Sequence, residues 1–266
     1  MAKQSGIHQL RGKVGEMSYY RQSGVQQGLV RSINQGMSSR VKTSQEFANT
    51  RLNNEEFKTA TEFAAALLNG VVPIYRPMFN VFRNAKLSSK VLSIIKSTTG
   101  SWGIRMIAQT NAAAVAQAMN GISKNRASDL LDISVTADSE AISVGLTVTS
   151  SMQDVLTAIG ASGVIVKAYN VCVYEGVVTA VGEDRASTLV RLGGAEDTNI
   201  PSDTAVGTES SLDLEPLLPD LSIMTGRSPI YFVYTILMPY RTVNNVNHIL
   251  QEACCYSIAP DPYSRS

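Results

Sequence analysis

The sequence predicts an α+β protein with an N-terminal β-hairpin arm at residues 1–42, a helical middle region at 43–130 and a C-terminal antiparallel β-sandwich-like domain at 131–266. Three patterns support this prediction. The arm is basic and rich in glycine, the middle region repeats apolar residues at helical spacing, and the last region alternates apolar with polar residues. With 266 residues, 44% of them hydrophobic and 17% charged, the chain is long enough to bury a core and too apolar to be disordered.

The arm is predicted to be a two-stranded hairpin. Residues 12–21 form its first strand, residues 22–25 its turn and residues 26–32 its second strand. Glycines permit positive backbone dihedrals and close backbone approach, and those expected to shape this backbone are Gly12, Gly15, Gly24 and Gly28. Because an isolated hairpin has too little apolar surface to be stable, it must dock on its own chain, on a neighbouring subunit or on an acidic partner.

The charge of the arm differs from that of the remaining chain. Residues 1–42 contain seven Lys/Arg against one acid, Glu16, whereas residues 43–266 contain sixteen basic and twenty-one acidic residues. A basic arm on an acidic body suits head-to-tail packing between like subunits. A solvated tail is the alternative. The residues expected to face a partner protein or DNA are Lys13, Tyr19, Tyr20, Arg21, Arg31, Arg40 and Lys42.

The middle region is predicted to start with a capping box at residues 43–46, in which Glu46 follows a hydroxyl residue by three positions. Asn53 with Glu56 offers a second helix start, and Gly70 a stop. The stripe that would pack this helix is Phe57, Ala60, Phe63, Ala64, Leu67 and Leu68. Residues 71–84 contain Pro73 and Pro77 and indicate a broken or late-starting helix, and further helices are expected at 90–96 and over 104–119.

Past Asp132 the pattern changes to period two, which is typical of half-buried strands. A short helix is expected at 151–160, a helix at 243–250, and a long loop over 193–211 because of its Gly, Ser, Thr, Asp and Pro content. The irregular region continues to about residue 220 and contains Pro201, Pro216 and Pro219. It is longer than an ordinary connection and is a second candidate for contact with a neighbouring ring. Strands are predicted at 133–136, 142–149, 163–174, 177–181, 187–192, 230–238 and 253–259.

The residues that carry most enzyme chemistry are sparse. The two histidines, His8 and His248, lie far apart, and the cysteines Cys172, Cys254 and Cys255 lack metal-ligand spacing. Cys254 and Cys255 are adjacent on a predicted strand, so they point to opposite faces and are poor disulfide partners. No phosphate-binding glycine loop is present. We therefore expect no enzyme activity, no catalytic or metal-binding residues and no cofactor.

The first twelve residues are polar and lack the apolar run of an export signal, and no stretch reaches the roughly 20 apolar residues of a membrane span. The sequence therefore predicts a protein made in a cytoplasm, without a membrane partner.

Several residues of the arm carry a family resemblance. The Gly12–Gly15 motif Gly-Lys-Val-Gly, the Tyr19–Tyr20 pair, the turn at Gly24 and the pair Val30–Arg31 resemble the opening of a domain-of-unknown-function family found in Bacteroidetes and their crAss-like phages. The resemblance covers about residues 11–82 and is weak beyond. It implies an N-terminal hairpin, a helical segment, a C-terminal β-sandwich and a place among the virion's neck or tail ring proteins, and it supplies no catalytic residues.

The resemblance and the basic arm together predict a structural subunit of a tailed-phage virion, present in the particle and assembled in the host cytoplasm. Its partners would be further copies of itself, other neck or tail proteins, and DNA passing through the channel. Portal symmetry predicts a ring of twelve copies. The alternative is a nucleic-acid-binding accessory protein that uses the arm, although its charges are spaced rather than clustered. A further alternative is a host adhesin or pilus subunit, but such a protein needs an export signal, and the first twelve residues lack the apolar run of one.

Overall fold

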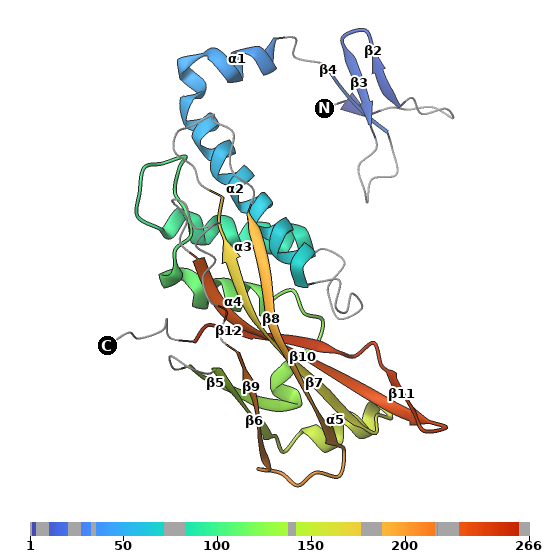
Figure 1. The fold of residues 1–266 in the computed structure, drawn as a ribbon. Helices are drawn as coiled ribbons and strands as arrows, with labels where there is room; N and C mark the ends of the chain where they lie inside the picture. The colour runs from blue at the N-terminus through green and yellow to red at the C-terminus, as the bar shows by residue number, and fades with distance from the viewer. Residues whose placement is uncertain are drawn as a thin grey trace. The chain divides into compact units, whose positions relative to one another are not determined.

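The computed structural model describes residues 2–3, 11–20, 28–32, 36–71, 83–137, 142–176, 188–215, 217 and 229–260. It confirms the α+β class, with a small antiparallel sheet at the N-terminus, a helical middle and curled antiparallel sheets at the C-terminus (Figure 1). The chain divides into two compact units, Met1–Asn53 and Asn54–Ser266, which we call the N-terminal unit and the main unit.

The sheet of the N-terminal unit has the antiparallel order β1-β4-β3-β2. The prediction of one strand over 12–21 is wrong, because this stretch reverses at Gly15–Glu16, where Gly15 adopts a φ of 55°. The predicted turn at 22–25 lies outside the described residues. The strands are β1 (Ala2–Lys3), β2 (Gly12–Val14), β3 (Met17–Tyr20) and β4 (Leu29–Ser32).

The predicted capping box at 43–46 is also wrong. Helix α1 (Met37–Thr43) ends there, and Ser44 makes no side-chain cap. The Thr43 hydroxyl instead donates to the carbonyl of Ser39 at 3.0 Å, and the Glu46 carboxylate accepts from Arg40 at 2.6 Å. Both side chains of the expected box are therefore used elsewhere, and a short 3-10 turn (Gln45–Phe47) leads into the next helix.

Helix α2 (Ala48–Val71) runs without a break, so the second start predicted at Asn53 is wrong. Its predicted apolar stripe is buried except Phe57, which is 55% exposed. Helix α3 (Arg83–Ser97) contains the helix predicted at 90–96 and starts seven residues earlier than expected. Most of the proline-containing stretch at 71–84 lies outside the described residues.

The helix predicted over 104–119 is shorter than expected. Only α4 (Ala112–Asn120) is an α-helix, preceded by a 3-10 turn at Gln109–Asn111 and followed by another at Ala127–Asp129. Buried carboxylates bind the amide groups of the preceding segment: Glu56 accepts from Gly103 N at 3.0 Å and Glu175 from Ile107 N at 2.5 Å. These bonds hold the segment in an irregular course that helical periodicity does not reveal.

The main unit contains two sheets. The first has the order β5-β6-β9, and the second has the order β11-β10-β7-β8 with β12 also paired to β10. Helix α5 (Met152–Ile159) follows β6 and ends at Gly160, as predicted. The strands are β5 (Leu131–Ala137), β6 (Ile142–Val148), β7 (Gly163–Tyr174), β8 (Leu189–Pro201), β9 (Glu209–Leu214), β10 (Pro229–Val243), β11 (Val246–Ile249) and β12 (Cys254–Ile258).

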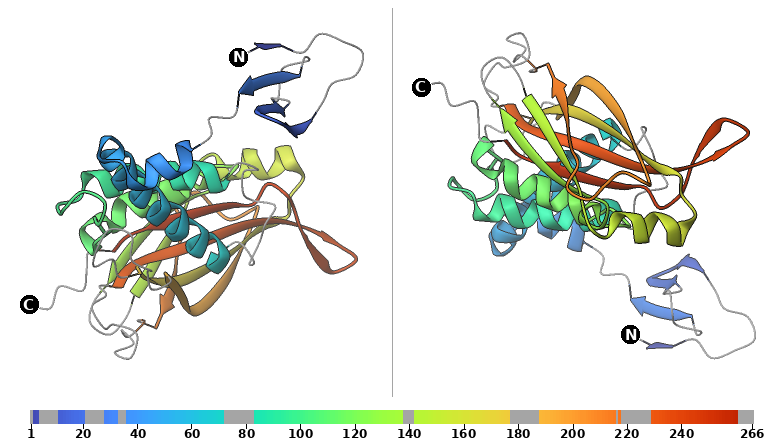
Figure 2. Two further views of the ribbon diagram at one scale, coloured as in Figure 1. Left: turned by 90° about the horizontal axis from the view of Figure 1, so that it is seen from above. Right: turned by 90° about the horizontal axis from the view of Figure 1, so that it is seen from below.

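The five-stranded sheet is covered on both faces, so the main unit has three layers (Figure 2). Along β10, Phe232, Tyr234 and Ile236 join a core with α2, α3 and α4, whereas Val233 and Leu237 join a second core with the three-stranded sheet and α5. Because successive side chains of a strand point to opposite faces, a strand covered twice must be apolar throughout. This requirement explains the apolar run predicted as a strand at 230–238, in which Thr235 is the one aliphatic polar residue.

Two predicted irregular or helical stretches are strands. The expected loop over 193–211 is wrong at its two ends: β8 continues to Pro201, and β9 begins at Glu209. Residues 202–208 between them form the connection and carry many of the polar residues that predicted a loop. The helix expected at 243–250 is also wrong, because Asn244 and Asn245 both adopt positive φ, 52° and 63°, and form the two-residue turn of the β10–β11 hairpin.

A buried ion pair fastens the irregular segment to α2. Arg105 donates from Nε to Glu56 Oε1 at 2.7 Å and from Nη2 to Oε2 at 2.9 Å, and from Nη1 to the carbonyl of Lys96 at 2.9 Å. The Glu56 side chain is fully buried. Burial alone raises the pKa of its carboxyl group, but the hydrogen bonds from Arg105 and Gly103 and the charges of Arg105 and Lys96 outweigh it, so the pKa is lowered.

We predict that Glu56→Gln destabilises the main unit by about 3 kcal/mol, because removing one partner of a buried pair leaves the other charge uncompensated. Glu62→Gln on the same helix is the matched control. Glu62 is exposed and lies 3.9 Å from Lys58, so its loss is expected to cost about 0.5 kcal/mol or less. Urea unfolding of the three proteins measures the difference, and equal midpoints for the two variants would contradict the assignment.

The lowered pKa of Glu56 also predicts a pH dependence. The group contributes its stabilisation fully above its ordinary pKa of about 4.5, and this contribution is lost as the pH falls through the lower pKa of the folded state. The stability gap between the wild-type protein and Glu56→Gln should therefore be constant near neutral pH and shrink in acid. Unfolding curves from neutral pH to below pH 4 test this, and a gap that widens in acid would refute it.

Candidate functional site

The N-terminal sheet places the predicted arm residues on two different faces. Residues directly opposite each other on antiparallel strands project to the same side, and neighbours along a strand project to opposite sides. The registers pair Tyr19 with Gly12 and Val30, and Ser18 with Lys13 and Arg31. Tyr19 and Tyr20 therefore lie on opposite faces.

One face of this sheet, the apolar face, consists of Gly12, Val14, Met17, Tyr19, Val30 and Ser32. Val14 is 59% exposed and Met17 38% exposed, and Tyr19 and Val30 are half-buried. Among the described residues of the N-terminal unit, Leu29 is the one apolar side chain that is fully buried. The unit therefore presents apolar surface that its own described residues do not cover.

The opposite face, the basic face, consists of Lys13, Ser18, Tyr20, Leu29 and Arg31. Lys13 and Arg31 are exposed. The guanidinium group of Arg31 stands 5.4 Å from the centre of the Tyr20 ring, within the range of a cation–π contact. This contact orients one of the two cations. Two charges of one sign thus lie in one row with Ser18 between them.

The remaining predicted arm residues are not gathered with this face. Arg40 and Lys42 belong to α1, and Arg40 is already paired with Glu46 at 2.6 Å and lies 6.0 Å from the Phe47 ring. Arg21 and Gly24 lie outside the described residues. Gly12 and Gly15 have positive φ angles of 102° and 55°, in agreement with their predicted backbone role, whereas Gly28 is buried next to Leu29.

A second surface, the outer face of the three-stranded sheet, was not predicted from the sequence. Its strands bury Leu131, Val144 and Leu212 on the inner side. The outer side carries only small polar and acidic residues, which the registers align in rows across β5, β6 and β9: Asp132 with Thr147 and Glu209, Ser134 with Gly145 and Ser211, and Thr136 with Ser143 and Asp213. Period-two alternation predicted a half-buried strand at 133–136, but the start of the partner strand β9 was assigned to the loop over 193–211.

By contrast, edges of the five-stranded sheet are closed by amide side chains. Asn120 donates to the Ser257 carbonyl at 3.0 Å and accepts from its N–H at 2.6 Å. Gln109 makes the same two-way contact with the backbone of Tyr231, at 3.4 Å and 2.7 Å. Each amide imitates the pairing of a neighbouring strand, so these stretches are not open to strand addition.

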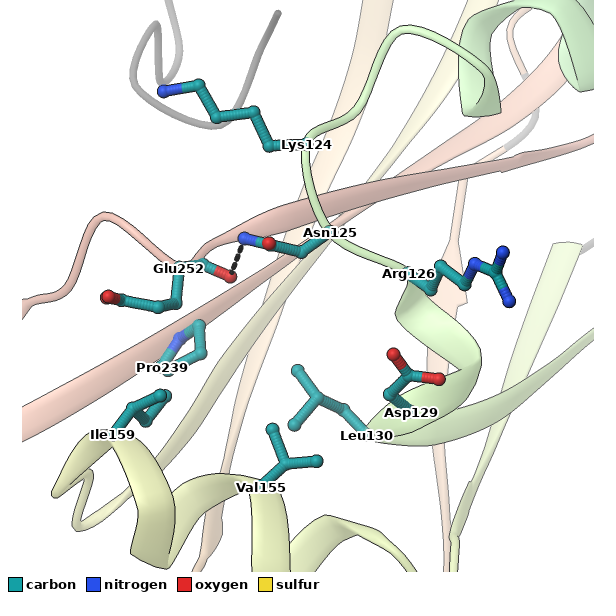
Figure 3. Close-up of a pocket in the computed structure, with 9 residues that line it drawn as sticks. All are labelled: Lys124, Asn125, Arg126, Asp129, Leu130, Val155, Ile159, Pro239 and Glu252. Atoms are coloured by element: carbon teal, nitrogen blue, oxygen red, sulfur yellow. Dashed lines mark hydrogen bonds between the residues drawn. The ribbon is translucent and has the colours of Figure 1, made fainter.

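Two pockets are formed by described residues of the main unit. One, of about 400 Å³, has Leu130, Val155, Ile159 and Pro239 at its base. In Figure 3 the charged ends of Lys124 and Arg126 point away from its centre, and Asn125 is bonded to the Glu252 carbonyl at 2.7 Å. No polar groups converge there as a binding site for a small molecule requires. A second, of about 760 Å³, lies along α3 and α4 and is lined mainly by small residues and two lysines.

The thiols are buried and free, in agreement with the prediction that Cys254 and Cys255 do not pair. Burial raises the pKa of Cys255 to about 11 and that of Cys254 further, so neither is a reactive thiolate at neutral pH. Within the described residues no group of three or more His, Cys, Asp or Glu side chains is placed to hold a metal ion. No described helix is long and apolar enough to cross a membrane.

No protein-family model matches the sequence, and no curated protein matches it at a significant level.

We predict that the Gly15 turn controls the order of the N-terminal sheet. Gly15→Val should cost about 1–2 kcal/mol, because a β-branched residue resists a positive φ. Amide hydrogen exchange of β3 should then become about five- to thirty-fold faster. Gly15→Asn is the matched control, since asparagine tolerates this conformation. Equal exchange rates in both variants would show that the turn is not limiting.

Proposed function

We propose that this chain is a non-catalytic structural subunit of a tailed-phage virion that forms a homo-oligomeric ring in the neck or tail and connects neighbouring layers around the DNA channel. The observation that carries this proposal is the uncovered apolar face of the N-terminal sheet. The resemblance of residues 11–82 to the crAss-like phage family supplies the setting, and the ring's copy number and axial position stay open.

The apolar face favours a protein partner. Full burial of a side chain such as Val14 or Met17 contributes about 1.5–3 kcal/mol, and a four-stranded sheet with one buried apolar residue among those described lacks that stabilisation by itself. A ring requires two different surfaces per subunit, since a head-to-tail contact joins unlike patches and closes by rotation. A compact N-terminal unit and a larger main unit can supply such a pair.

The basic face supports the second candidate, a nucleic-acid-binding accessory protein. Lys13 and Arg31 stand together on an exposed row, and both side chains bind phosphate in other proteins. Two cations give a weak electrostatic footprint, however, and Arg40 is engaged with Glu46. We therefore retain protein–protein assembly as the first function and DNA contact as an addition to it.

We predict that the full-length protein forms a closed oligomer and that a chain lacking residues 1–42 is a folded monomer. Multi-angle light scattering gives the masses, and circular dichroism checks that the truncated chain keeps its fold. Monomers in both cases would contradict self-assembly through the arm, and tight salt-dependent binding of DNA by the full-length monomer would favour the accessory protein.

A single substitution tests whether the apolar face makes the contact between subunits. Val14→Asp puts a charge into the apolar face and should shift the full-length protein toward monomer. Val206→Asp is its control, because Val206 lies in a turn of the main unit and is similarly exposed, at 63% against 59%. Equal masses for the two variants would exclude the apolar face from the contact.

A further inference from the structure

The two sheets described above carry matching rows of charge. In the N-terminal sheet, Lys13, Ser18 and Arg31 stand side by side on three adjacent strands. In the three-stranded sheet, Asp132, Thr147 and Glu209 do the same. Adjacent strands are about 4.8 Å apart, so in each row the outer two residues are separated by about 10 Å at the backbone. One row reads base–hydroxyl–base and the other acid–hydroxyl–acid.

We infer that the basic face of the N-terminal sheet docks on the outer face of the three-stranded sheet in a second copy of this chain. This inference rests on the proposed function and adds a second contact to the one made by the apolar face. Lys13 and Arg31 meet Asp132 and Glu209, and the central Ser18 and Thr147 hydroxyls lie between the two ion pairs. Each row carries charges of one sign, so a row of the opposite sign complements it.

The shape of the receiving face fits a sheet as its partner. Its centre is Gly145, and the side chain next to that position is the Ser134 hydroxyl, so no large side chain stands above the backbone. Small hydroxyl residues surround it, and the strands β5, β6 and β9 contain no Lys or Arg. The third acid, Asp213, accepts a hydrogen bond from Ser143 at 2.8 Å, which leaves Asp132 and Glu209 as the outward anions.

A second copy is favoured over DNA by the sign of this charge. The receiving face carries three acids and repels phosphate, whereas Lys13 and Arg31 are the two cations that the basic face carries among the residues whose side chains are described. A head-to-tail contact between two unlike faces also repeats from copy to copy, as a ring requires. In such an assembly the apolar face remains available for a different surface, so that the N-terminal sheet lies between two neighbours.

A charge swap tests this contact in the full-length protein. The paired substitution Lys13→Glu with Arg31→Glu should weaken self-association at least about tenfold, because it places like charges opposite each other. Asp132→Lys with Glu209→Lys should do the same, and all four substitutions in one chain should restore association. Sedimentation at low and high salt measures it, and the wild-type association should weaken as salt screens the pairs.

Lys124→Glu with Arg126→Glu is the control, since it changes the net charge equally at residues outside both faces. An oligomer that persists in every variant overturns the docking mode and leaves the proposed ring standing. A wild-type protein that stays monomeric at all concentrations overturns both. A change of hydrodynamic radius at constant monomer mass would place the sheet on its own chain, and loss of DNA binding without a change in mass would assign the basic face to phosphate.

Discussion

The constraint on which the main unit depends is the two-sided burial of β10 and its partner β7. These strands pair over twelve residues, from Pro229 with Tyr174 to Tyr240 with Gly163. Each side must be covered by apolar material, and helices α2, α3 and α4 cover one side while the three-stranded sheet and α5 cover the other. The ion pair of Glu56 with Arg105 joins α2, one of these covering helices, to the irregular segment that precedes α4.

Closing the core creates a second requirement, because a covered sheet still has open edges. The chain meets it with the side chains of Gln109 and Asn120, which satisfy backbone groups of β10 and β12 at the two ends of the α4 segment. Unsatisfied edge groups invite pairing with other chains. In the assembly proposed above, such a subunit would benefit from strand edges that are closed where contact is unwanted and from sheet faces that are open where contact is wanted.

The sequence predicted the elements whose pattern is set by burial, and missed those set by distant partners. The apolar run at 230–238 and the alternation at 142–149 identified strands because each face of the strand has a constant environment. The course of 98–111 could not be predicted, because it depends on Glu56 and Glu175, which are remote in sequence. The prediction of a loop over 193–211 was wrong at its ends for another reason: polar residues such as Ser210 and Ser211 in β9 have the same composition as the true connection at 202–208.

The candidate site also depends on strand pairing that the sequence does not reveal. The arm's tyrosines and cations were identified from composition, but their division between an apolar and a basic face follows only from the reversal at Gly15, which shifts every later residue to a defined side. A hairpin turning at 22–25 alone would leave Lys13 without its place in the row of Ser18 and Arg31. The turn at Gly15 thus creates the basic row, and the pairing of residues 209–214 as strand β9 creates the acidic row. The complementarity of the two charged rows depends on the register of strand pairing, so it is recognised only when the pairing of the strands is known.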